Sequence, residues 1–141
     1  MRIDQATRLI NTCAEQMNAR YKRTVFDEWA IISLAAEKGR LLAYTGPRKA
    51  EFQKNFRADA RPLSTALLKA EGDAGDFEFS HDGVGTGFES YVVLGKGVFL
   101  ICNNTVQSMD GIARDPLWLS AQVPFLELSE KFRHDPVELS N

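Results

Sequence analysis

The residues that come closest to a chemical motif are the glycines of the run Gly83-Val84-Gly85-Thr86-Gly87. A dinucleotide-binding loop has the pattern GxGxxG between a strand and a helix, so that the helix N-terminus meets the pyrophosphate. Here the third glycine comes one residue too early, and the residues that follow it predict a strand. We therefore expect no nucleotide binding at this loop.

Histidine and cysteine offer little for catalysis or metal binding. His81 is followed by Asp82, but such a neighbouring pair is common by chance, and His134 lies at a predicted helix end. Cys13 and Cys102 stand alone without CxxC spacing, as small buried hydrophobes do in a reducing compartment. No serine lies in a GxSxG context. We predict a protein that is not an enzyme, with no catalytic residue, cofactor or metal.

Carboxylates occur as pairs at the ends of predicted elements. Asp27 and Glu28 precede an apolar run, and Glu71 and Asp73 lie in a polar connection. The simplest expectation for such residues is that water solvates them.

Composition limits the partners of the chain. Its 141 residues suit one domain, and its hydrophobic content of 44% is ordinary for a globular protein. A formal net charge of −2 gives no overall attraction to nucleic acid or anionic lipid. No apolar run approaches the roughly 18–20 residues that cross a bilayer, and the N-terminus lacks the apolar segment of a signal peptide. We predict a cytoplasmic protein that binds neither nucleic acid nor membrane.

The elements that would position any site are organised around a predicted β-meander between Asp76 and Asn104. Aromatic and β-branched residues suit a half-buried strand, and glycine-rich turns close both gaps. The last run of the meander is wholly apolar, which predicts a strand buried on both faces. An earlier hairpin turns at Lys38-Gly39-Arg40, and its apolar first strand should lie inside the sheet. The expected strands are Trp29–Ala36, Leu41–Thr45, Phe77–Ser80, Phe88–Leu94 and Val98–Cys102.

Apolar residues at helical spacing predict three helices around these strands. The first begins near Ile3 with Asp4 as its N-cap, and the second covers Arg48–Ala70. The third starts at Asp115-Pro116, has an apolar stripe that reaches Phe132, and ends at Asp135-Pro136. Residues 103–114 leave open a short helix capped by Ser108.

Proline should disturb two of the helices. An internal proline removes a backbone hydrogen bond and costs about 3 kcal/mol unless the helix bends. Pro62 therefore predicts a kink, or two helices that meet near Arg61, and Pro124 predicts a kink in the third helix. The tail Val137–Asn141 is expected to fray.

The predicted order is α-β-β-α-β-β-β-α within a single domain, 1–141, whose core spans about 4–133. This order predicts an α+β fold with an antiparallel five-stranded sheet flanked by helices on both faces.

The run from Trp29 to Tyr44, WAIISLAAEKGRLLAY, resembles the first hairpin of the roadblock family of dynein light chains and their bacterial relatives, which have a profilin-like sandwich fold. The run Gly97–Cys102, GVFLIC, is similar to the last strand of that family. The resemblance extends from about Asp4 to Phe132. It implies a non-enzymatic interaction module that forms homo- or heterodimers, often by joining sheets edge to edge. Such a module acts as a platform for small Ras-like GTPases or motor complexes. The alternative is a ligand-sensing domain like PAS and GAF modules, which have a similar sheet.

A homodimer is the assembly that we expect. The strand that carries Phe77 and Phe79 follows a loose link and is a candidate sheet edge, which would leave backbone groups unpaired. The second helix lies beside it in the roadblock architecture and offers Phe52, Phe56 and Leu63. Exposed together, these five side chains would form an apolar patch that a two-fold dimer could cover. The alternative is that they face the core of their own monomer.

Overall fold

A computed structural model describes residues 1–35, 39–81 and 85–139 of the chain. Gly83 and Val84 of the glycine-rich run lie outside the described residues, and so does the side chain of His81. The predictions made for this loop and for His81 therefore stay predictions. The helices and strands are α1 (Ile3–Tyr21), β1 (Glu28–Ser33), β2 (Arg40–Thr45), α2 (Lys49–Lys69), β3 (Ala74–His81), β4 (Gly85–Gly95), β5 (Val98–Asn103), α3 (Met109–Ala113), α4 (Trp118–Ala121) and α5 (Val123–His134).

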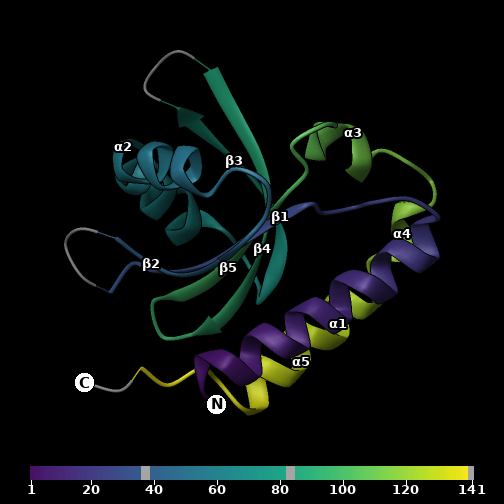
Figure 1. Cartoon of the computed structure of the whole chain (residues 1–141), viewed down its shortest axis with the longest axis horizontal. Coiled ribbons are helices and arrows are strands. Elements are labelled where there is room, and N and C mark those ends of the chain that lie inside the picture. The colour runs from purple at the N-terminus through teal and green to yellow at the C-terminus, as the bar shows by residue number, and fades with distance from the viewer. Residues whose placement is uncertain (36–38, 82–84, 140–141) are drawn as a thin grey trace.

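The strands form one antiparallel sheet in the order β2-β1-β5-β4-β3, so the α+β prediction with an antiparallel five-stranded sheet is confirmed (Figure 1). β1 lies between β2 and β5, as its apolar run predicted, and all six of its residues are buried. The turn between β4 and β5 contains Gly97 at φ +70°, a conformation that glycine adopts without a steric penalty.

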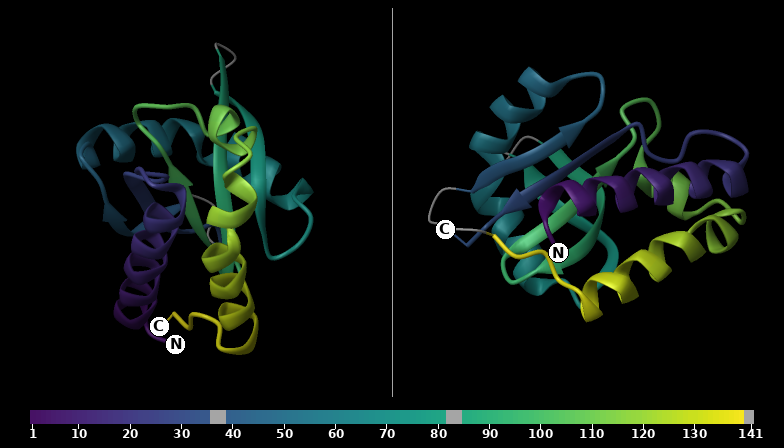
Figure 2. Two further views of the ribbon diagram at one scale, coloured as in Figure 1. Left: turned by 90° about the vertical axis from the view of Figure 1, so that its right-hand side faces the viewer. Right: turned by 60° about the horizontal axis from the view of Figure 1, so that its bottom comes forward.

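Alternate residues of the inner strands contribute to two separate apolar clusters. On β1, Ile31 packs in a cluster with residues of α1 and α5, whereas Ile32 packs in a cluster with residues of α2. On β5, Leu100 belongs to the first cluster and Ile101 to the second. Because successive side chains of a strand point to opposite faces, α1 and α5 lie against one face of the sheet and α2 against the other, as the ribbon views show (Figure 2).

The two helix prolines have different outcomes. α2 is one continuous helix that passes through Pro62, so the alternative of two helices that meet near Arg61 is wrong, and the alternative of a kink within one helix stays a prediction. Phe56 before the proline and Leu63 after it are both buried in the same cluster, and this packing holds the two halves together. At the C-terminal end the prediction of one kinked helix is also wrong, because the chain forms α4 and α5 with Pro124 in the first turn of α5, where no backbone donor is required.

Two predictions about the ends of the described chain, the N-cap at Asp4 and a frayed tail from Val137, differ from the structure. α1 begins at Ile3, before the predicted cap Asp4, and the side chain of Gln5 accepts a hydrogen bond from the backbone N–H of Arg2 at 3.1 Å. The tail does not fray at Val137, which is buried and donates its backbone N–H to the carbonyl of Leu94 at 2.7 Å. The C-terminal end of β4 therefore holds the start of the tail.

Candidate functional site

β3 forms one of the two outer edges of the sheet, and β2 forms the other. β3 pairs with β4, and no strand follows it in the sheet. The backbone N–H of Val93 donates to the carbonyl of Asp73 at 2.7 Å, immediately before the strand. Since hydrogen-bonded and non-hydrogen-bonded pairs alternate along an antiparallel ladder, the backbone groups of Ala74, Asp76 and Glu78 point away from β4. The predicted sheet edge is confirmed.

The two faces of β3 differ sharply in chemistry. Phe77 and Phe79 are buried in the cluster beneath α2, and their ring centroids are 5.9 Å apart. Asp76 and Glu78 alternate with them and therefore lie on the opposite face, on the side of α3. The residues Asp76 to Ser80 include no lysine or proline, the residues that commonly protect an edge strand.

A pocket of about 210 Å³ opens on the acidic face, between the β3–β4 hairpin and α3. Phe88 of β4 and Met109 of α3 supply apolar wall. Asp76, Glu78 and Asp110 supply carboxylates, of which Asp110 forms an ion pair with Arg114 at 3.3 Å. The pocket therefore combines hydrophobic walls with a negative rim.

The Asp76 carboxylate is partly withdrawn from water. It accepts a short hydrogen bond from the hydroxyl of Ser90, its cross-strand neighbour on β4. Burial raises the pKa of Asp76 and outweighs the opposing effect of the Ser90 hydrogen bond. A nearby cation stabilises the charged form of such a desolvated carboxylate more than that of a fully hydrated carboxylate.

The predicted interface residues do not form an exposed patch. Phe56, Leu63, Phe77 and Phe79 are buried in the monomer, and Phe52 is half-buried with its ring centroid 6.2 Å from that of Phe56. The expectation that they are exposed together is wrong, because α2 packs its apolar stripe directly onto β3 and the neighbouring strands. Each monomer thus covers its own aromatic side chains.

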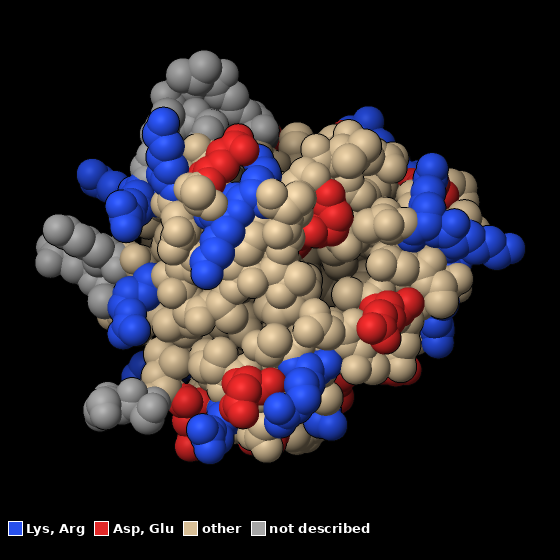
Figure 3. All heavy atoms as spheres, in the orientation of Figure 1, with Lys and Arg blue, Asp and Glu red and all other residues tan. Residues whose placement is uncertain are grey.

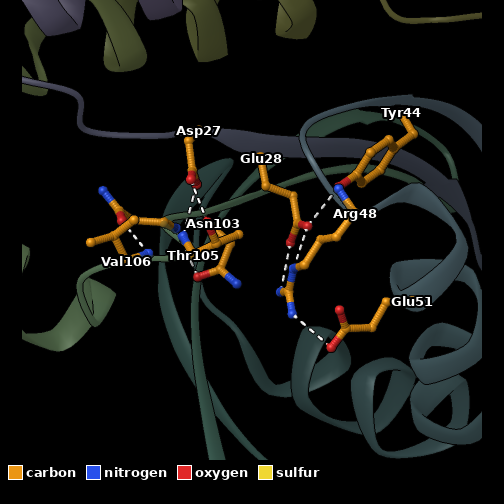
Figure 4. A network of polar contacts seen from close by, with 9 residues as sticks. Asp27, Glu28, Tyr44, Arg48, Glu51, Asn103, Thr105 and Val106 are labelled. Carbon is orange, nitrogen blue, oxygen red and sulfur yellow. Dashed lines mark hydrogen bonds and ion pairs between the residues drawn. The ribbon is translucent and has the colours of Figure 1, made fainter.

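A buried ion pair that the sequence analysis missed joins β1 to the start of α2 (Figure 4). Only 1% of the Glu28 side chain is exposed, so the expectation that water solvates it is wrong. Arg48 donates to the two carboxylate oxygens from Nε at 2.8 Å and from Nη2 at 3.1 Å, and the hydroxyl of Tyr44 donates at 2.7 Å. Burial and the hydrogen bond to Glu28 raise the pKa of Tyr44 to about 12.

This cluster is suited to holding the fold together and not to catalysis. Both oxygens of Glu28 already accept hydrogen bonds, and Arg48 also lies 3.6 Å from Glu51. Next to Glu28 in the chain, Asp27 accepts a hydrogen bond from the backbone N–H of Thr105 at 2.7 Å, which ties the loop after β5 to β1 (Figure 4). A charged residue directly before an apolar strand is the only sequence signal for this network.

One group of basic side chains lies where α1 and α4 meet, on the right-hand side of Figure 3. Arg20, Lys22 and Arg23 end α1 and are exposed. Arg23 pairs with Asp115 at 2.8 Å, and the hydroxyl of Tyr21 donates to the same carboxylate at 2.9 Å. This end is a solvated helix terminus, partly neutralised by Asp115.

The interior beneath α1 and α5 is filled. The cavity described there, between residues that include Met17, Trp29 and Phe125, measures about 10 Å³, close to the smallest space that holds one water molecule. Cys13 and Cys102 are buried near it, and burial raises the pKa of the Cys13 thiol to about 12. Among the described residues, no group of three or more histidines, cysteines or carboxylates could hold a metal ion.

Comparisons with models of known protein families, with curated proteins and with solved structures found no match for this chain. A search for membrane spans among the described helices found none of sufficient length and hydrophobicity.

Proposed function

We propose that this protein is a non-enzymatic interaction module that binds another polypeptide by adding a strand of that polypeptide to β3. In such binding the main-chain hydrogen bonds provide affinity, and pockets for alternate side chains provide specificity. β3 has both features, since its outer backbone groups face away from β4 and a pocket lies along its acidic face.

The observation that carries the proposal is the edge position of β3 without the usual protection. The strand is eight residues long, and its outward backbone groups include those of Ala74, Asp76 and Glu78. An edge of this length invites pairing unless lysine, proline or a covering element blocks it. The other edge, β2, is shorter, with six residues.

The roadblock resemblance implies two kinds of partner for such a module. One is a second copy of the chain, joined sheet edge to sheet edge, and the other is a small Ras-like GTPase. The order of the elements agrees with the order on which that resemblance is based, with the short helices α3 and α4 between β5 and α5. The PAS- or GAF-like sensory alternative gains no support from the cavity of about 10 Å³ beneath α1 and α5.

The proposal is tested by removing one outward backbone donor of β3. Glu78→Pro removes the N–H that faces away from β4, whereas Glu78→Ala removes the same carboxylate and keeps the N–H. Because both variants lack the carboxylate and only one lacks the N–H, recovery of partners with the purified chain from its native cells should be much lower with Glu78→Pro than with Glu78→Ala. Hydrogen exchange on a recovered complex should show protection of the Asp76 and Glu78 amides.

Equal recovery with wild type and Glu78→Pro, together with unchanged exchange at these amides, would contradict strand addition. Light scattering on the isolated chain gives the second measurement. A two-fold dimer that Glu78→Pro dissociates would identify a second copy as the occupant, and a monomer at high micromolar concentration would exclude it.

A further inference from the structure

We infer that the segment that pairs with β3 is an extended, basic stretch of a different protein, with lysine or arginine at alternate positions. This inference rests on the proposed function and names the partner chemistry that the edge selects. It follows from the position of Asp76 and Glu78 on the strand and from the pocket beside them.

The register of an added strand decides which of its side chains meet the carboxylates. The backbone groups of Asp76 and Glu78 point outward, so residues of the partner would pair directly opposite them. Side chains of directly opposed residues lie on the same face, with Cβ atoms about 5 Å apart. Every second side chain of the added strand would therefore lie beside Asp76 or Glu78, on the α3 side of the sheet.

A second copy of this chain fits the edge poorly. Two-fold pairing of β3 with itself keeps the acidic faces of both copies on the same side of the joined sheet. If the axis passes at Asp76, Phe77 or Glu78, a carboxylate of one copy lies opposite a carboxylate of the other. Like charges directly opposite each other destabilise a strand pair, and no basic residue of β3 between Ala74 and Ser80 relieves them.

The pocket favours a long cationic side chain. Its wall includes Phe88 and Met109, which can cover the methylene groups of lysine or arginine. Its rim includes Asp76 and Glu78, within reach of an ammonium or guanidinium group. The Asp76 carboxylate, which already accepts a hydrogen bond from Ser90, would gain an ion pair. The basic residues at the α1–α4 end are on helix and turn segments and cannot form such a strand.

The inference is tested with two synthetic peptides that differ only in charge. The first is acetyl-TKVKVKVT-amide, which places lysine on one face of an extended strand, and the second is acetyl-TEVEVEVT-amide. Amide shifts in ¹⁵N spectra report the site, and titration gives Kd. We expect the lysine peptide to shift the β3 amides and the glutamate peptide to bind at least tenfold more weakly. We expect Asp76→Asn/Glu78→Gln to weaken lysine-peptide binding about tenfold, in line with the coupling of close charge pairs.

Three control measurements separate the effect of the Asp76 and Glu78 charges on peptide binding from an effect on folding. Glu138→Gln removes an exposed carboxylate that does not line the pocket and should leave binding unchanged. Raising the salt concentration from 50 to 500 mM should weaken lysine-peptide binding to the wild type, because screening acts on ion pairs at the surface; this measurement needs no variant. Thermal melting establishes that each variant is folded.

The outcomes distinguish this inference from the proposed function. If both peptides shift the β3 amides with similar Kd, strand addition stands and the basic partner is wrong. If neither peptide shifts these amides at millimolar concentration, the basic partner is wrong and strand addition loses its support. A homodimer with β3 protected in the isolated chain would likewise overturn the basic partner, while leaving strand addition in place.

Discussion

Replacing Arg48 by methionine tests how the sheet holds the start of α2. The change would leave the Glu28 carboxylate, with 1% of its side chain exposed, dependent on the hydroxyl of Tyr44 alone. Removing one partner of a buried ion pair costs about 3–5 kcal/mol. The Arg48 side chain is 31% exposed, so water can approach the vacated site, and we reduce the expected loss to about 2–4 kcal/mol.

Replacing the other partner of the ion pair, Glu28, should reduce the free energy of unfolding less. Glu28→Gln keeps an oxygen that accepts from Tyr44, and Arg48 can turn toward Glu51 and water. We expect a loss of about 1–2 kcal/mol, the range of a hydrogen bond to a charged group. The double variant should be more stable than the sum of the two losses predicts, by about 1–2 kcal/mol, because neither charge remains unpaired.

Urea unfolding at pH 7 measures all three variants, with Trp29 and Trp118 as buried fluorescent reporters. A loss of 2–4 kcal/mol corresponds to a midpoint lower by about 1–2 M urea for a domain of this size. The reasoning is refuted if Glu28→Gln costs more than Arg48→Met, or if the two losses simply add. Glu51→Gln, which alters only the exposed end of the network, is the matched control and should change the midpoint little.

Three further predictions concern the core and the acidic face. Leu100→Ala and Ile101→Ala should each cost about 2–5 kcal/mol in urea unfolding, since these side chains are 1% and 2% exposed on opposite faces of β5; an unchanged midpoint in either variant would contradict double coverage. Cys13 and Cys102 should resist a thiol reagent at pH 8 until the protein unfolds, because burial raises both thiol pKa values; rapid labelling of the native protein would disagree. The pKa of Asp76 in the folded protein is raised above its ordinary 3.8, so the folded state binds this proton more tightly than the unfolded state does. Stability is therefore lost as pH rises through the raised pKa. Asp76→Asn should therefore gain stability over the wild type from pH 3 to pH 7, and a constant difference across this range would count against the burial of the carboxylate.

The apolar runs were sufficient to place the inner strands. β1 and β5 are nearly continuous stretches of apolar residues, and only a position between other strands, with both faces covered, buries such a sequence. The ends of these strands were harder to predict. β1 begins at the charged residue Glu28, which can be buried only because Arg48 reaches it from a position 20 residues further along the chain. Local sequence contains no information on such a pairing, so the network was missed together with the start of the strand.

The alternation of Phe77 and Phe79 with polar residues predicted the strand β3, but what this apolar face packs against depends on the rest of the fold. Phe77 and Phe79 define an apolar face in either of two cases, a strand that packs on its own helix or a strand that packs on a partner. Periodicity is identical in the two cases, and only the position of α2 separates them. Because α2 brings Phe56 and Leu63 onto this face, the monomer's own core takes the aromatic side chains. What β3 presents at the edge of the sheet is therefore its backbone and its acidic face. If the proposed strand addition holds, a partner strand that complements both would be basic at every second residue.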